Sequence, residues 1–274
     1  MLHDFSYHRP SSMKEALDFL AQNGPKTAVF SGGTDLFVVI RAGVAKPAHV
    51  LDLKGIPELG KISWDKTEGL SVGACVTINT LTEYPAVREH FPVLRSAGEE
   101  LATFQLRNRA TMVGNVVTAS PCGDMGSPLM VLGGEVVLAS SSGERRMPLS
   151  EFITGVKRTL IRPDEVVSRI VVPPTWAGAV GGYHKLKRIK GHDLGVVAVA
   201  MVRKENTIRC AISSAAPTPV LLPDLAATSS VEDVQKKAQS MISPIDDVRC
   251  TKEYRSFMVD IFIKRLMKEL EAAA

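Results

Sequence analysis

Two short segments rich in glycine and hydroxyl side chains have the composition of an anion-binding backbone. Residues 31–35 read Ser-Gly-Gly-Thr-Asp, and residues 111–115 read Thr-Met-Val-Gly-Asn. Peptide N–H groups in such segments can point at an anion because small side chains leave the backbone accessible. We therefore interpret the two segments as backbone loops that hold one diphosphate between them. A diphosphate held in this way is typical of a bound dinucleotide.

The first segment leads into a pattern typical of a helix. Leu36, Val39 and Ile40 recur at helical spacing. A diphosphate at the glycines would then meet a helix N-terminus, whose free N–H groups and dipole favour an anion. The alternative is a plain tight turn with Thr34 or Asp35 as N-cap, because a short Gly-Gly pattern is not specific by itself. Neither segment has the Rossmann GxGxxG or the P-loop GxxxxGK[ST] pattern, which disfavours those two nucleotide-binding classes.

Composition narrows the class of protein. The chain has 274 residues, of which 45% are hydrophobic, enough for two domains and a large core. No apolar run approaches membrane-spanning length, and residues 1–6 lack the features of a signal peptide, so we expect a cytoplasmic protein without a membrane span. The net charge of +4 is spread along the chain, which disfavours nucleic acid as a partner.

Residues that support catalysis or bind metals show no matching pattern. The four cysteines are scattered without CxxC spacing, which argues against a metal or iron-sulfur site and against a disulfide framework in this chain. The six histidines are isolated, and no Ser/His/Asp or paired-carboxylate arrangement is evident. We therefore predict no catalytic residue and no metal ligand in this chain.

The elements that must position the two segments are readable in part. Ser12 and Glu15 form a capping-box pattern ahead of an apolar stripe that ends before Asn23, which predicts a helix. Alternating residues predict two hairpins, over residues 62–72 and 135–149, within an antiparallel sheet that has helices on one side. Residues 173–178 look like a linker because adjacent prolines stop helices and strands. Two further strands and a final helix predict a separate C-terminal α+β domain.

Several motifs in a fixed order resemble one family. The stretch QLRNRATMVGNVVTASPCGD, residues 105–124, resembles the second flavin-binding segment of the medium, FAD-carrying subunit of molybdenum hydroxylases, the xanthine dehydrogenase and carbon monoxide dehydrogenase group. SGGTD is similar to that family's first diphosphate loop, and FSYHRPSSMKEALDFL to its usual start. YHKLKRIKGHDLGVVAVA and DVRCTKEYRSFMVDIFIKRL resemble its C-terminal domain. Motifs in one order are more specific than any single motif.

The resemblance implies an architecture and a cofactor. The expected fold is α+β: a two-lobed FAD-binding domain of the vanillyl-alcohol-oxidase-like type, with a small α/β lobe over residues 1–57 and an antiparallel-sheet lobe over residues 58–174, followed by a small α+β domain over residues 179–274. The residues expected to bind FAD are Val29, Phe30, Ser31, Gly32, Gly33, Thr34, Asp35, Thr111, Gly114, Asn115, Val117, Gly123, Asp124 and Lys185.

Three of these positions carry specific expectations. Asp124 would accept hydrogen bonds from sugar hydroxyls, with a turn or N-cap role as the alternative. Lys185 aligns with a family lysine near the flavin and would favour the reduced anion, with a surface lysine as the alternative. Val113 departs from the family pattern, which has glycine there. Because valine disfavours positive φ, the backbone at this position must suit a β-branched residue, and the departure leaves the tightness of FAD binding open.

The resemblance also implies a role in a complex. A large partner subunit would hold a molybdenum-pterin cofactor, and a small partner would hold two-iron iron-sulfur clusters. Electrons would reach the FAD of this chain singly and leave to NAD or another acceptor. The alternatives are a self-contained FAD-dependent oxidoreductase with its own organic substrate, and a non-catalytic module in which the glycine segments are only structural.

Overall fold

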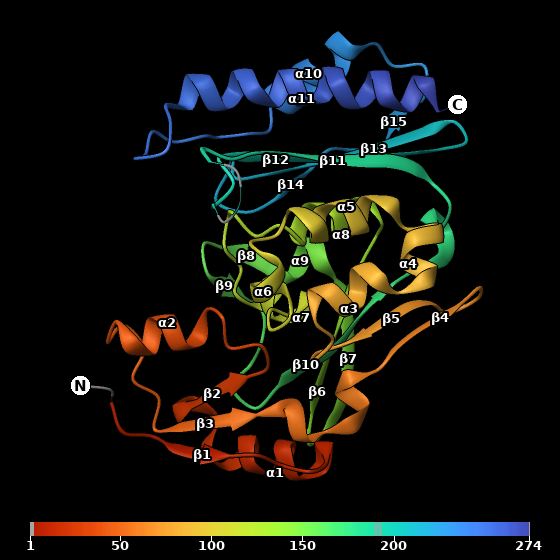
Figure 1. Ribbon diagram of the computed structural model, residues 1–274. Coiled ribbons are helices and arrows are strands. Elements are labelled where there is room, and N and C mark those ends of the chain that lie inside the picture. Colours follow the sequence, from red (N-terminus) through yellow and green to blue (C-terminus); the bar gives the residue numbers. More distant parts are fainter. Residues whose placement is uncertain (1–2, 190, 192, 274) are drawn as a thin grey trace.

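The computed structural model describes residues 3–189, 191 and 193–273. Its parts stack in chain order, with the N-terminal lobe at one end, the middle lobe at the centre and the C-terminal sheet and helices at the other end (Figure 1). Within the described residues, no helix combines the length and the apolar composition needed to cross a membrane.

The N-terminal lobe contains a small three-stranded parallel sheet and the helices α1 and α2. Its strands pair in the order β1-β3-β2, and both pairings are parallel. Helix α1 follows the predicted start, because the Ser12 side chain accepts a hydrogen bond from the Glu15 N–H. The Glu15 carboxylate, however, accepts from the N–H of Ser11 rather than Ser12, so the reciprocal half of the capping box is displaced by one residue. The elements are β1 (Ser6–His8), α1 (Met13–Asn23), β2 (Thr27–Phe30), α2 (Leu36–Arg41) and β3 (His49–Asp52), with 3-10 helices η1 (Gly24–Lys26), η2 (Leu53–Gly55) and η3 (Pro57–Gly60).

The middle lobe contains a five-stranded antiparallel sheet in the order β4-β5-β10-β6-β7. The two predicted hairpins are present as β4 with β5 and as β6 with β7. The strands are β4 (Ile62–Asp65), β5 (Gly69–Gly73), β6 (Glu135–Ser140), β7 (Gly143–Pro148) and β10 (Val166–Val172), with a small hairpin of β8 (Ile153–Gly155) and β9 (Arg158–Thr159). The helices are α3 (Ile78–Glu83), α4 (Pro85–His90), α5 (Pro92–Glu100), α6 (Phe104–Arg107), α7 (Met112–Val117), α8 (Gly126–Val131) and α9 (Leu149–Phe152).

The C-terminal sheet is covered on both faces. Helices α5 and α8 of the middle lobe pack on one face, and α11 packs on the other (Figure 1). Alternate residues of β12 follow this division: Ala198 and Ala200 belong to the core shared with the middle lobe, whereas Val197 and Val199 belong to the core under α11. The elements are η4 (Pro174–Trp176), β11 (Val180–Leu186), β12 (Val197–Lys204), β13 (Thr207–Ser213), β14 (Val220–Leu221), β15 (Leu225–Ala226), α10 (Val231–Gln239) and α11 (Lys252–Ala272).

The segment with adjacent prolines is ordered and packed. Residues 173–178 contain the 3-10 helix η4, and Trp176 is buried in the main hydrophobic core. The Arg209 guanidinium lies 4.8 Å from the centroid of the Trp176 ring. The connection between β10 and β11 is therefore anchored to the fold on both sides of the prolines.

Candidate functional site

A cavity of about 620 Å³ lies where the three parts of the chain meet. Its volume falls in the range of sites for small molecules and cofactors. Residues from the first segment, from the second segment and from β11 all line it, including every residue that the sequence analysis proposed. Sequence positions as distant as Val29 and Lys185 therefore share one cavity.

The first segment presents a row of backbone N–H groups. Within the described part of the chain, the N–H groups of Gly32, Gly33, Thr34 and Asp35 have no hydrogen-bond acceptor in the protein. Gly33 has φ +75, a left-handed conformation that favours glycine. Helix α2 begins directly after the segment, and no side chain caps it. These free amides and the helix end form a cradle suited to an anion.

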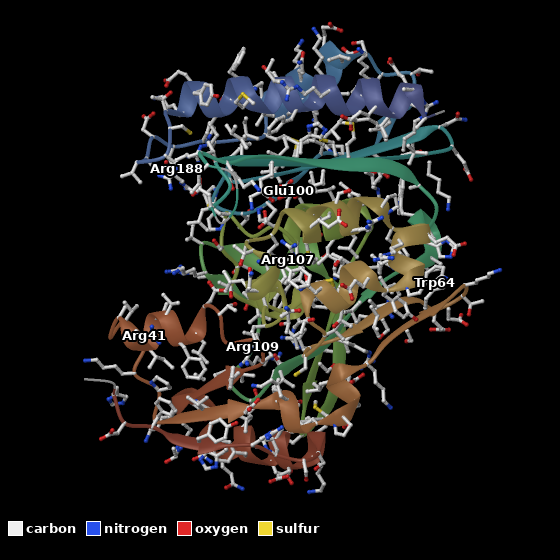
Figure 2. All side chains as sticks on the ribbon, viewed as in Figure 1. Arg41, Trp64, Glu100, Arg107, Arg109 and Arg188 are labelled. Atoms are coloured by element: carbon white, nitrogen blue, oxygen red, sulfur yellow. The ribbon has the colours of Figure 1, made fainter. Side chains whose placement is uncertain are left out.

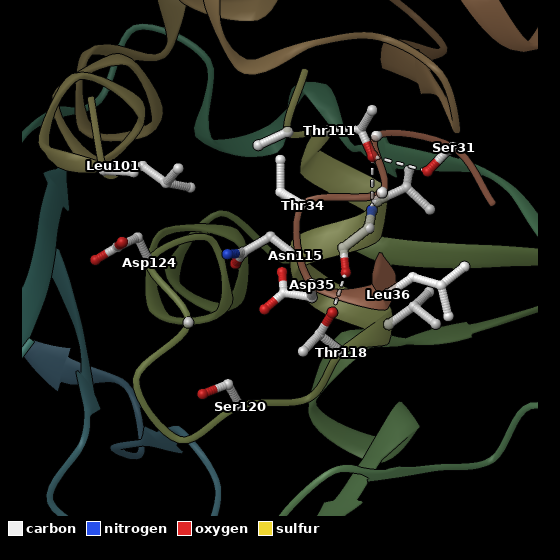
Figure 3. Close-up of a pocket in the computed structure, with 18 of the residues that line it drawn as sticks. Ser31, Thr34, Asp35, Leu36, Leu101, Thr111, Asn115, Thr118, Ser120 and Asp124 are labelled. Carbon is white, nitrogen blue, oxygen red and sulfur yellow. Dashed lines mark hydrogen bonds between the residues drawn. The ribbon is translucent and has the colours of Figure 1, made fainter. Parts of the chain in front are cut away.

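The first and second segments touch each other. A Cβ atom on Gly32 would lie 2.2 Å from the Arg109 carbonyl oxygen, so only glycine permits this approach. Arg109 lies at the junction of the N-terminal lobe and the middle helices (Figure 2). The hydroxyls of Ser31 and Thr111 are also 3.3 Å apart, within hydrogen-bond distance (Figure 3). The cleft wall at this point is a direct contact between the two predicted segments.

The second segment is a helix, and its interpretation as a loop is wrong. Residues Met112–Val117 form α7, and the Thr111 hydroxyl accepts a hydrogen bond from the Gly114 N–H at the N-terminus (Figure 3). Thr111 favours a helix here because its hydroxyl accepts a hydrogen bond from an N–H group of the first turn that would otherwise lack a partner. Asn115 accepts a hydrogen bond from the Met125 N–H at 3.1 Å and so holds the turn that carries Asp124.

Val113 lies inside α7 and is buried. A helical backbone has negative φ, which a β-branched residue adopts without left-handed strain. The expectation that this position suits valine is therefore confirmed.

The opposite end of the cavity carries a buried ion pair. The Lys185 ammonium donates to the Asp124 carboxylate at 2.9 Å and to the Glu100 carbonyl at 3.3 Å. The Tyr183 hydroxyl donates to the other Asp124 oxygen at 2.8 Å. Burial raises the pKa of the Asp124 carboxyl above its ordinary value, although Lys185 and Tyr183 oppose that effect. Burial, together with the Asp124 charge, raises the pKa of Tyr183.

The alternative interpretation of Lys185 as a surface residue is wrong. Its side chain is 1% exposed, because β11 turns it inward onto Asp124. Lys187 is also paired, at 2.6 Å from the Glu100 carboxylate. Glu100 lies between the middle helices and the C-terminal sheet (Figure 2). Lys190 and His192, which belong to the motif YHKLKRIKGHDLGVVAVA, lie outside the described residues.

Comparison with known proteins identifies the family. Residues 3–175 match the model described as the FAD binding domain in molybdopterin dehydrogenase. The chain is 31% identical to the carbon monoxide dehydrogenase medium chain of Hydrogenophaga pseudoflava, over 96% of each chain. It is 27% identical to a putative xanthine dehydrogenase FAD-binding subunit of Escherichia coli, over 98% of this chain and 97% of the other. The chain belongs to the family of FAD-binding subunits of molybdopterin dehydrogenases.

Solved structures of this family share the whole fold. A carbon monoxide dehydrogenase structure from Hydrogenophaga pseudoflava has a chain that superposes with a TM-score of 0.89 at 30% identity, covering 99% of each chain. The predicted family and the two-lobed FAD-binding fold are therefore confirmed, as is FAD as the cofactor class of this chain. Relatives in the FAD-binding family of molybdopterin dehydrogenases are flavoprotein subunits of oxidoreductases.

The cavity of this family member fits FAD on structural grounds. The free amides of residues 32–35 supply donors for a diphosphate at one end. Apolar side chains that sequence reasoning missed form a slot suited to a flat ring system: Leu101, Leu106, Ile161, Val166 and Val167. They come from two distant parts of the chain, residues 101–106 and 161–167, and each is an ordinary core residue by pattern. Only the folded arrangement brings both parts to one cavity.

A contact from the C-terminal part that the sequence did not reveal reaches a residue that lines the cavity. The Arg249 guanidinium lies 2.7 Å from the Cys122 sulfur and 3.0 Å from the Gly195 carbonyl oxygen. Cys122 lines the cavity beside Gly123. In this FAD-binding subunit, residues far downstream of the family match therefore hold the second flavin segment in place.

Proposed function

We propose that this chain is the FAD-carrying electron-transfer subunit of a molybdenum hydroxylase complex. It would receive electrons from iron-sulfur clusters on a small partner and pass them to NAD or another acceptor. A large partner would hold the molybdenum-pterin cofactor and carry out the chemistry on the substrate. The observation that most directly supports this proposal is the set of free amides at residues 32–35. These amides form one end of a cavity of the size of a cofactor site.

Within this proposal, the predicted residues divide by position. Residues 31–35 with Thr111, Gly114 and Asn115 would bind the diphosphate, with Val29 and Phe30 leading into that segment and Val117 at the end of α7. Gly123 and Asp124 would border the sugar and ring portion, where Lys185 balances the Asp124 charge. Because Asp124 already accepts from Tyr183 and Lys185, it would present a neutralised pair to the cofactor. The proposed units remain residues 1–57, 58–174 and 179–274.

Bound FAD supplies the ability to accept electrons one at a time and to donate them in pairs. The residues of the chain would fix the diphosphate with backbone donors and exclude water from the ring with apolar walls. They would also place a lysine-carboxylate pair beside the reacting part. In each of these roles the protein positions the cofactor or shapes its surroundings.

The test compares the purified chain with a preparation purified through it from its native source. We expect the isolated chain to bind FAD and to transfer electrons between reduced nicotinamide and an artificial dye, without hydroxylating any substrate. The native preparation should contain molybdenum and iron in partner chains. Turnover of an organic donor by the isolated chain would favour the self-contained oxidoreductase, and a colourless chain that takes up no FAD would favour the structural module.

A further inference from the structure

A network of polar side chains lies behind the first segment, outside the residues that line the cavity. The Lys54 ammonium donates to the Asp52 carboxylate at 2.7 Å and to the Ser31 carbonyl oxygen at 3.1 Å. The Tyr7 hydroxyl donates to the other oxygen of Asp52. The Lys54 nitrogen also lies 3.2 Å from the centroid of the Phe30 ring. One cation therefore contacts Ser31 of the first segment and Phe30 directly before it.

The contact with Ser31 constrains the neighbouring amide. The Ser31 carbonyl and the Gly32 N–H belong to the same peptide group, which is planar and trans. In such a group the C=O and N–H bonds point in opposite directions. A lysine that holds the carbonyl on one side therefore holds the Gly32 N–H on the other side, and Gly32 lines the cavity. The charge of Lys54 also strengthens this hydrogen bond.

The lysine is itself held in place by a buried carboxylate. The Asp52 side chain is 3% exposed, whereas that of Lys54 is 34% exposed. Burial raises the pKa of Asp52, but hydrogen bonds from Lys54 and Tyr7 outweigh it, so that the pKa lies below its ordinary value. Asp52 is therefore ionised at neutral pH and keeps the ammonium beneath the Ser31 peptide. Asp52 ends strand β3 and Lys54 lies in η2, which begins directly after that strand.

We propose that Lys54 is a positioning residue for the diphosphate of FAD, acting through the Ser31–Gly32 peptide. The inference rests on the proposed FAD site and names a residue behind it that directs the cradle. Lys54 would orient one donor of the cradle and place positive charge behind it, without contacting the cofactor. Its partner Asp52 would hold the lysine, and Tyr7 would support Asp52 alone.

The experiment measures the dissociation constants of FAD and ADP by calorimetry, and the thermal stability, for matched variants of the full chain. Lys54→Met should weaken both ligands about tenfold, because it would release the Gly32 amide from its fixed direction and remove the positive charge behind the cradle. Tyr7→Phe should lower the melting temperature with FAD affinity within twofold of wild type. Lys14→Met, which removes an exposed lysine paired with Asp18 in the same lobe, should change neither ligand.

A conservative pair of variants keeps the test decisive if Lys54→Met does not fold. Lys54→Arg retains charge and donors and should bind FAD more tightly than Lys54→Gln, which lacks the charge. The inference is overturned if Lys54→Met or Lys54→Gln binds FAD like wild type, or if Tyr7→Phe weakens FAD as much as the Lys54 variants do. A wild-type chain that binds no FAD in the same titration would instead refute the proposed function.

Discussion

Two adjacent glycines in the first segment serve different physical purposes. Gly32 is needed for space, because a Cβ there would collide with the Arg109 carbonyl oxygen. Gly33 is needed for backbone conformation, with φ +75, and a Cβ there would also lie 2.4 Å from the Phe30 ring. A bulky residue at Gly32 would separate the two segments as well as obstruct the cradle. Gly33 is therefore the cleaner position at which to test the free amides.

We predict that Gly33→Ala weakens FAD binding at least about tenfold and lowers the unfolding free energy by about 1–2 kcal/mol, because alanine resists the left-handed conformation. Gly43→Ala is the matched control, since Gly43 has φ +71 but a Cβ there meets nothing within 4 Å. It should lose somewhat less stability, because it shares the left-handed conformation but no aromatic ring has to move, and its FAD affinity should be unchanged. Equal affinities of the two variants, measured by calorimetry beside urea denaturation, would contradict a role for the Gly33 backbone.

At the scale of elements, the structure could be predicted where it follows from local sequence patterns and was missed where it depends on contacts between distant segments. The hairpins β4–β5 and β6–β7 could be predicted because residues alternate around short polar turns. Strand β11 was not predicted, since Gly181 and Gly182 interrupt its pattern and Lys185 adds a charge. The helix α7 was mistaken for a loop because Gly114 resembles a loop residue, whereas Thr111 caps a helix there. The charge of Lys185 is tolerated in a buried strand because the Asp124 carboxylate pairs with it.

The cap of α7 makes a prediction at this scale. Thr111→Ala removes both the bond to the Gly114 N–H and the contact with Ser31, so it should lower the unfolding free energy by about 1 kcal/mol and weaken FAD binding. Thr251→Ala removes the equivalent cap of α11, far along the chain, where the hydroxyl accepts from the Tyr254 N–H. That variant should lose comparable stability and keep its FAD affinity. Thr111→Ser should restore FAD binding, and a Thr111→Ala variant with normal affinity would oppose the assignment.

For the whole molecule, the C-terminal part completes the cavity as well as the core. Three hydrogen bonds run from the C-terminal part to residues 121–124. The Ser214 hydroxyl donates to the Pro121 carbonyl oxygen, the Arg249 guanidinium to the Cys122 sulfur, and the Lys185 ammonium to the Asp124 carboxylate. Most of these residues lie in loops between elements, and pairing between residues so far apart depends on how the sheet packs on α5 and α8. The cavity is therefore a property of the assembled chain.

The pair formed by Asp124 and Lys185 tests this dependence. Removing one partner of a buried ion pair leaves the other charge uncompensated, so Asp124→Asn and Lys185→Met should each lower the unfolding free energy by about 3–5 kcal/mol. The double variant should lose far less than the sum, because no lone charge remains buried. Urea denaturation of the FAD-free chain measures all four members of the cycle. The exposed pair Arg95 and Glu99 on α5 is the control, with an expected coupling of about 0.5 kcal/mol. If the Asp124–Lys185 coupling is as small as that of the control, the contact does not join the C-terminal sheet to the flavin segment energetically.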